Sequence, residues 1–201
     1  MIPAVRIARP LQGGRAFGCA LFQAASLALC VVGLSIVAQG TWIPIKAEIA
    51  QVLLDRAFAA SLAEHHAVRP WPWADTAPVA RVSVDRLGVS DVVLSGGSGQ
   101  AMAFGPTMLK RETSAVTVLA AHRDTHFAYV KDLRKGDAVA LQHIDGRVER
   151  YRVVGFQTVR WDRFAIPRDP ARPLLVLATC YPFDAIERGP WRRVAWAERV
   201  D

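Results

Sequence analysis

The chain has 201 residues, a net charge of +7 and 52% hydrophobic residues, which is enough for one folded domain and an appended segment. The positive charge does not indicate nucleic-acid binding. Residues 1–46 carry four basic residues and no acidic one, whereas the other 21 basic residues are interspersed with all 18 acidic ones. No basic block is left to follow a phosphate backbone, so we expect no nucleic-acid partner.

Residues 16–38 form an uncharged apolar segment of 23 residues, long enough to cross a bilayer at roughly 1.5 Å per residue. Arg6, Arg9 and Arg15 precede it, and the first acidic residue is Glu48. The positive-inside rule then places residues 1–15 in the cytoplasm and the rest of the chain outside it. The alternative is a cleaved signal peptide, but the apolar core of such peptides has only about 7–15 residues. We therefore predict a retained transmembrane helix at 16–38.

Residues 39–77 are expected to connect this helix to the domain. An amphipathic helix is predicted over residues 46–66, with an apolar face at helical spacing formed by Ile49, Val52, Leu53, Ala57, Ala60 and Leu62. The segment RPWPWAD at residues 69–75 follows. Its two prolines exclude a helix, and we expect its two tryptophans to pin the segment to the domain.

From residue 78 to 201 the pattern changes to that of strands. Residues 81–85 alternate polar and apolar side chains, and residues 116–121 form a near-continuous apolar run typical of a strand buried on both faces. Asp145-Gly146 between two strand-like runs indicates a hairpin. Further short strands are predicted at 92–94, 138–142, 148–159, 174–179 and 194–197. These elements predict a closed or nearly closed all-β barrel.

Three of the predicted strands carry reactive side chains at or near their ends. His122 follows the run 116–121, Cys180 follows the run 174–179, and Arg192 stands just before the last strand. Cys19 and Cys30 lie in the apolar segment, so Cys180 is an unpaired thiol outside it. A thiol beside an imidazole and a guanidinium is the chemistry of an activated cysteine nucleophile. The alternative is a small buried apolar residue.

Together these residues resemble those of the sortases, which are membrane-anchored cysteine transpeptidases. The resemblance rests on His122 in LAAHRDTHF, Cys180 in VLATCYPFDAI and Arg192 in GPWRRVAWAE. The segments RPWPWAD, AFGP (103–106), HRDTHF (122–127) and TCYPFDAI (179–186) resemble the class GN sortases of Gram-negative bacteria. Two departures are Ala121, where glycine is frequent, and Arg193, which leaves two adjacent arginines as candidates. The register R-x-V-x-x-A-E favours Arg192.

The resemblance implies an eight-stranded barrel with Cys180, His122 and Arg192 as catalytic residues. Thr179 would support the oxyanion donors, and Asp124 and Arg193 are secondary candidates. The implied partner is an exported protein with an LPXTG-like C-terminal sorting signal, which is transferred to an amine acceptor through a thioacyl intermediate. The implied location is the inner membrane, with the catalytic domain in the periplasm. No metal or other cofactor is expected.

Two competing functions are weighed against this one. Papain-like and NlpC/P60 cell-envelope peptidases place the cysteine before the histidine, at a helix N-terminus, whereas here His122 comes first and Cys180 ends a strand. An L,D-transpeptidase would need a Ser-x-Gly-Cys context, which this chain lacks. A non-catalytic, membrane-tethered binding barrel is the non-enzymatic alternative, and the complete His/Cys/Arg set argues against it.

Overall fold

A computed structural model describes residues 13–109, 115–187 and 189–200 of the chain. It divides into two compact units, Met1–Ala47 and Glu48–Asp201, which are described separately. Arg6 and Arg9, on which the predicted orientation in the membrane depends, lie outside the described residues.

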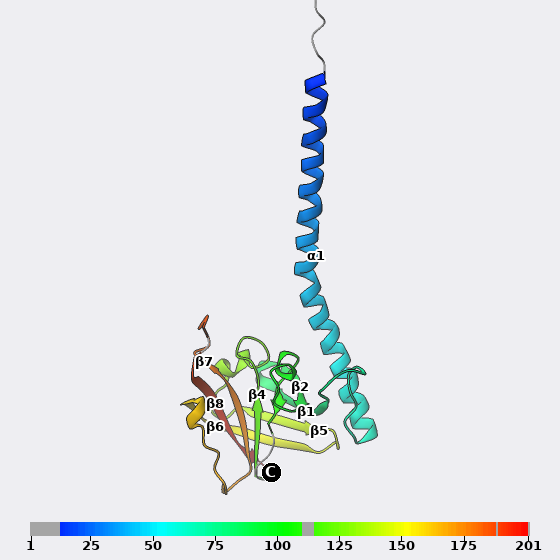
Figure 1. The fold of residues 1–201 in the computed structure, drawn as a ribbon. Coiled ribbons are helices and arrows are strands. Elements are labelled where there is room, and N and C mark those ends of the chain that lie inside the picture. Colours follow the sequence, from blue (N-terminus) through cyan, green and yellow to red (C-terminus); the bar gives the residue numbers. More distant parts are fainter. Residues whose placement is uncertain (1–12, 110–114, 188, 201) are drawn as a thin grey trace, which may run out of the picture. The chain divides into compact units, whose positions relative to one another are not determined.

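One long helix, α1 (Gly13–Glu64), precedes the strands (Figure 1). It joins the two helices that the sequence predicts at 16–38 and 46–66, because the chain stays helical through Pro44. A proline removes one backbone hydrogen bond without ending this helix. By length and composition the described part of α1 from Phe22 could cross a membrane, although a signal sequence near the N-terminus would pass the same test.

The last part of α1, from Glu48, packs within the second unit. Leu54 and Phe58 are buried in one cluster with Val92 and Leu94. Ile49, by contrast, is 53% exposed, as is Val52 at 49%. Of the predicted face, Ala57 is buried and Leu62 packs against the cluster, whereas Ile49 and Val52 are exposed. The prediction is thus confirmed for the later part of the helix and wrong at these two positions, because the barrel surface, and not the apolar pattern alone, selects which residues are covered.

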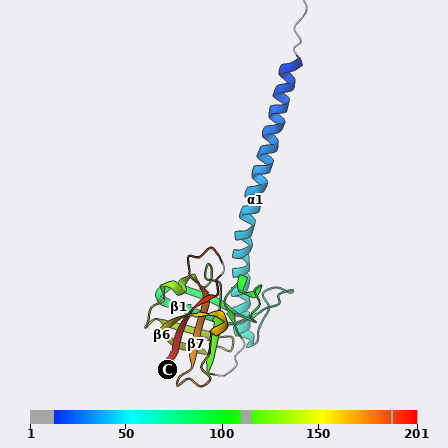
Figure 2. The same ribbon diagram turned by 60° about the vertical axis from the view of Figure 1, so that its left-hand side comes forward.

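The second unit is an eight-stranded closed barrel within the described residues, as predicted (Figures 1 and 2). The strands are β1 (Pro78–Val84), β2 (Val89–Ser95), β3 (Thr107–Met108), β4 (Val116–Ala120), β5 (Ala138–His143), β6 (Val148–Arg160), β7 (Leu174–Tyr181) and β8 (Trp191–Val200). Their order around the barrel is β1-β2-β3-β4-β7-β8-β6-β5, and β5 closes it onto β1. The two-residue β3 is the strand that the sequence pattern does not reveal.

Strand alternation divides the apolar residues of β4, β7 and β8 between two clusters. Leu119, Leu175, Leu177 and Ala195 belong to the large cluster inside the barrel. The intervening residues Val116, Val118, Val176 and Val194 form a second cluster, against which Phe164 and Ile166 of the β6–β7 connection pack. Both faces of these strands are therefore covered, which explains their near-continuous apolar sequences.

Two glycines are required by the backbone around the barrel. Gly146 adopts a φ of +84° in the predicted β5–β6 hairpin, a conformation that glycine adopts without strain. Gly105, in the AFGP segment, lies so close to β2 that a Cβ atom would be 2.7 Å from the carbonyl oxygen of Val92. The AFGP segment can therefore approach β2 and lead into β3 only without a side chain at this position.

An ion pair between Asp137 and Arg86 provides a test of the barrel's acid stability. The Asp137 side chain is 6% exposed and accepts hydrogen bonds from Arg86 Nε at 2.6 Å, Arg86 Nη2 at 2.7 Å and the Arg134 amide at 2.7 Å. The hydrogen bonds from Arg86 hold the pKa of Asp137 below its ordinary value. The resulting stabilisation is complete above the unfolded-chain pKa of about 3.9 and is lost as the pH falls through the folded-state pKa.

We expect Asp137→Asn to lower Tm by several degrees at pH 7. Below pH 5, the Tm of this variant should fall less with decreasing pH than that of the unsubstituted protein. Asp162 is the matched control, because its pair with Arg160 has the same forked geometry at 3.1 Å but side chains that are 39% and 44% exposed. Solvent screens such pairs, so Asp162→Asn should change Tm little. Thermal unfolding followed by circular dichroism between pH 3 and 7 measures both. Equal effects of the two substitutions would contradict the prediction.

Candidate active site

Strands β4, β7 and β8 place His122, Cys180 and Arg192 at neighbouring positions. Cys180 of β7 is directly paired with Arg192 of β8. The parallel β4–β7 ladder ends with Ala120 opposite Ala178, and His122 and Cys180 follow this last pair by two residues each. Adjacent strands are about 4.8 Å apart. Residues distant in sequence are thus brought to the same end of three consecutive strands.

The three residues also share one face of the sheet. Side chains alternate along a strand, so Cys180 lies on the face of Val176, and Arg192 on the face of Val194, in the outer cluster. Although β4 ends at Ala120, the next residue, Ala121, is buried in the inner cluster and its amide donates to the carbonyl oxygen of Ala178, so the alternation that includes Val116 and Val118 on the outer face places His122 on that face. His122 is exposed, and Cys180 and Arg192 are partly exposed. A thiol, an imidazole and a guanidinium are therefore grouped where a peptide can reach them.

The register separates the two adjacent arginines. Arg193 is paired with Thr179 on the face opposite to Cys180. Its guanidinium lies 4.9 Å from the centre of the Phe156 ring, and its Nη1 donates to the Thr158 hydroxyl at 3.4 Å. On the face of Cys180, Nη1 of Arg192 donates to the carbonyl oxygens of Gly189 at 3.0 Å and Trp191 at 2.8 Å.

The other two candidates contact the histidine segment. The Thr179 side chain is on the inner face, 2% exposed, and its hydroxyl donates to the carbonyl oxygen of Ala121 at 2.8 Å. Thr179 thereby fixes β7 to the residue before His122, while its predicted oxyanion role stays a prediction. Asp124 is 68% exposed and accepts a hydrogen bond from Nε of Arg123 at 3.3 Å. In this arrangement Asp124 contacts the residue after His122.

Arg123 is a buried residue of the site that had no sequence signal beyond its place in HRDTHF. It is 8% exposed and donates hydrogen bonds to backbone carbonyls of the β7–β8 loop, which follows Cys180. The sequence around it, Arg123-Asp124 after a strand-like run, indicates only a polar turn. Its burial depends on a loop 59 residues further along the chain, which no local pattern indicates.

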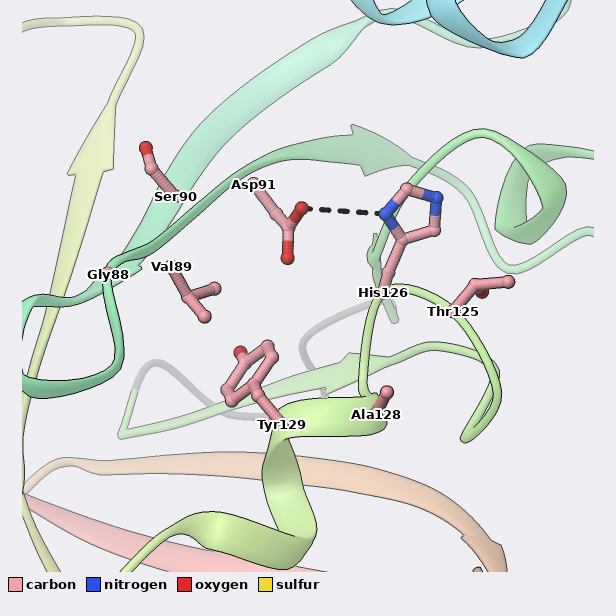
Figure 3. A pocket seen from close by; sticks show the side chains of 8 residues that line it. All are labelled: Gly88, Val89, Ser90, Asp91, Thr125, His126, Ala128 and Tyr129. Atoms are coloured by element: carbon pink, nitrogen blue, oxygen red, sulfur yellow. Dashed lines mark hydrogen bonds and ion pairs between the residues drawn. The ribbon is translucent and has the colours of Figure 1, made fainter. Parts of the chain in front are cut away.

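A pocket of about 410 Å³ lies beside the segment that follows His122 (Figure 3). In this pocket Nδ1 of His126 lies 3.5 Å from Oδ1 of Asp91, so the His126 side chain contacts β2. Burial, and to a smaller extent the nearby Asp91 carboxylate, raises the pKa of the Tyr129 hydroxyl well above its ordinary value. The pocket is lined by Gly88, Val89, Ser90, Asp91, Thr125, His126, Ala128 and Tyr129. Cys180 is not among them, so this pocket is separate from the candidate active site. Within the described ranges, no three histidine, cysteine or acidic side chains gather as metal ligands would.

Comparison with known proteins agrees with this geometry. The family model for the sortase domain matches residues 82–200, a range that contains His122, Cys180 and Arg192. Sortase D of Bacillus subtilis (strain 168) is 34% identical over 84 residues, which are 41% of this chain and 42% of the relative. The chain thus matches less than half of that relative's length.

Two solved structures share the fold. Sortase A from Corynebacterium diphtheriae superposes with a TM-score of 0.57 at 20% identity, covering 64% of this chain and 63% of the other. Sortase C-1 from Actinomyces oris superposes with a TM-score of 0.55 at 25% identity, covering 62% and 75%. With a domain match over more than half of its length, the chain belongs to the sortase family, whose members are cysteine transpeptidases.

Proposed function

We propose that this protein is a membrane-anchored transpeptidase that cleaves an LPXTG-like C-terminal sorting signal and transfers the cleaved protein to an amine. The observation that carries the proposal is the pairing of Cys180 with Arg192, with His122 at the adjacent strand end on the same face. Sortases as a family act on proteins that bear sorting signals, which supports an exported protein as the partner.

In the first step, the Cys180 thiolate attacks the carbonyl carbon of the threonine in the sorting signal. The carbon–sulfur bond forms as the peptide C–N bond breaks, and protonated His122 gives its proton to the departing amine. Arg192 faces the developing oxyanion. Among the described residues its hydrogen bonds all come from Nη1, which leaves Nε and Nη2 to donate to this oxygen.

In the second step, the amine of the acceptor attacks the thioacyl carbonyl carbon. The new C–N bond forms, the C–S bond breaks, and the amine's proton returns to His122, so the enzyme is regenerated. Water attacking the same carbon would give hydrolysis, which is the outcome expected of a cell-envelope peptidase. No metal or other cofactor is required by these steps.

The valines of the outer cluster are covered, but its margin is partly exposed at Ala178, Phe164 and Ile166, and this apolar margin suits the leucine and proline of such a signal. Ala178 precedes Cys180 on this face, and Phe164 and Ile166 from the β6–β7 connection pack on the same cluster. We propose that the signal lies along this apolar surface with its threonine carbonyl at Cys180, because burial of apolar side chains favours that placement.

The segments RPWPWAD, AFGP, HRDTHF and TCYPFDAI further support the assignment of this protein to the class GN sortases.

Cys180 should be the residue that becomes acylated. We expect Cys180→Ala to abolish cleavage and transfer of a peptide containing LPXTG, because it removes the nucleophile. His122→Ala should be nearly as severe, because the leaving amine then lacks its proton donor. Mass spectrometry of the protein incubated with the peptide, without an amine, should find the acyl group on Cys180. Acylation elsewhere, or cleavage by Cys180→Ala, would rule the proposal out.

The two arginines form an internal control. Arg192→Ala should lower kcat/KM by about 10²–10³, the loss typical of one oxyanion donor. Arg193→Ala should retain most of the activity, because Arg193 is on the opposite face. Steady-state kinetics with a fluorogenic sorting-signal peptide measures both. If Arg193 proved essential and Arg192 dispensable, the oxyanion assignment would be wrong.

The proposed location is the inner membrane, with α1 as a single span and the catalytic domain in the periplasm. The uncharged run at 16–38 after three arginines supports this orientation. An alkaline phosphatase fused after Asp201 should be active in cells and remain with the membrane fraction. A fused β-galactosidase should be inactive. The opposite pair of activities would contradict the proposed orientation, and release of the phosphatase from the membrane would indicate a cleaved signal.

A further inference from the structure

We infer that Arg123 is a positioning residue that fastens the β7–β8 loop to the segment carrying His122. The Arg123 side chain is 7% exposed. Its Nη1 donates to the carbonyl oxygen of Pro182 at 2.6 Å, and its Nη2 donates to the carbonyl oxygens of Ala185 and, at 3.4 Å, Glu187. One side chain therefore holds three backbone oxygens that lie within six residues of the same loop.

These contacts require an arginine. A buried cation is costly unless its N–H groups have partners, and the carboxylate that Arg123 contacts, Asp124, is largely exposed. The loop carbonyls provide the remaining compensation. The planar guanidinium presents donors in several fixed directions, whereas a lysine ammonium is a single compact charge. A lysine here could not reach all three carbonyls at once.

The position of the loop links Arg123 to the three candidate catalytic residues. Arg123 directly follows His122. The loop begins just after Tyr181, the residue that follows Cys180, and ends before Trp191, the residue that precedes Arg192. Its Gly189 carbonyl also accepts from Arg192. The segment that follows His122 also contacts β2, through His126 Nδ1 and Asp91 Oδ1 at 3.5 Å. Arg123 thus holds the β7–β8 loop, which connects Cys180 to Arg192, against the residue next to His122. Substitution of Arg123 should make this loop more mobile while the barrel stays folded.

The test uses the full chain in detergent micelles, with Cys19→Ala and Cys30→Ala so that Cys180 is the remaining thiol. Arg123→Lys and Arg123→Ala are compared with the control Arg152→Lys. Arg152 also donates to a backbone carbonyl, that of Gly136 at 3.1 Å, but it is exposed and lies on β6. Two readouts are measured, amide hydrogen exchange by mass spectrometry and the rate at which iodoacetamide alkylates Cys180. Neither readout needs a sorting signal, so both remain informative if the proposed function fails.

Among the described residues 182–187, the Ala185 amide donates to the carbonyl oxygen of Pro182 at 3.4 Å, and Arg123 holds both the Pro182 and Ala185 carbonyls of this turn. Both Arg123 variants should therefore open the turn and speed hydrogen exchange of the Ala185 amide, in the peptide covering residues 182–187, by about tenfold. Hydrogen exchange of the amides in β1, β2 and β5 should stay unchanged. The rate at which iodoacetamide alkylates Cys180 should change in both Arg123 variants. The control Arg152→Lys should alter neither the exchange of the loop nor this rate. Given the proposed function, Arg123→Lys should lower kcat for peptide cleavage more than it raises KM. Unchanged loop exchange, an equal rise across all strands, or failure of both variants to fold would overturn the inference.

Discussion

The parallel pairing of β4 with β7 is the constraint on which the site depends. In a closed barrel a strand cannot slip by one residue without turning its whole core-facing set of side chains outward. The pairs from Val116–Leu174 to Ala120–Ala178 are therefore fixed by the apolar residues on both faces. Because this register is fixed, so are the ends of the two strands, and His122 and Cys180 are adjacent as a consequence of core packing.

Backbone carbonyls accept most of the hydrogen bonds that hold the polar residues around this strand end, and the one carboxylate among the acceptors, Asp124 beside Arg123, is largely exposed. Thr179 donates to Ala121, Arg123 donates to the β7–β8 loop, and Arg192 donates to Gly189 and Trp191. A carbonyl is a neutral acceptor, so Arg192 is fixed in place while its charge is not cancelled by a full negative charge. This arrangement suits the proposed transfer, in which Arg192 would act on a developing oxyanion.

Much of this arrangement was predictable from the sequence, because the informative signals are local. The period of two and the Asp145-Gly146 turn predicted most of the strands, and the position of Cys180 at a strand end predicted its accessibility. What could not be predicted depends on distant contacts. The strand β3 has only two residues, too few for a period, and the burial of Arg123 is created by the β7–β8 loop. Sequence alone also gives no reason why Ile49 is exposed while Leu54 is covered.

The packing of α1 on the barrel extends the folded unit beyond the strands. Val92 and Leu94 of β2 are directed away from the barrel interior, and Leu54 and Phe58 cover them. Gln51 Nε2 adds a hydrogen bond to the carbonyl oxygen of Phe104, at 2.9 Å, in the segment leading to β3. The helix end therefore packs on β2 and binds the segment that leads into β3, the strand that pairs with β4. Because β3 pairs with β4 and His122 follows β4 by two residues, the helix end and the candidate site lie on opposite sides of β3 in the strand order.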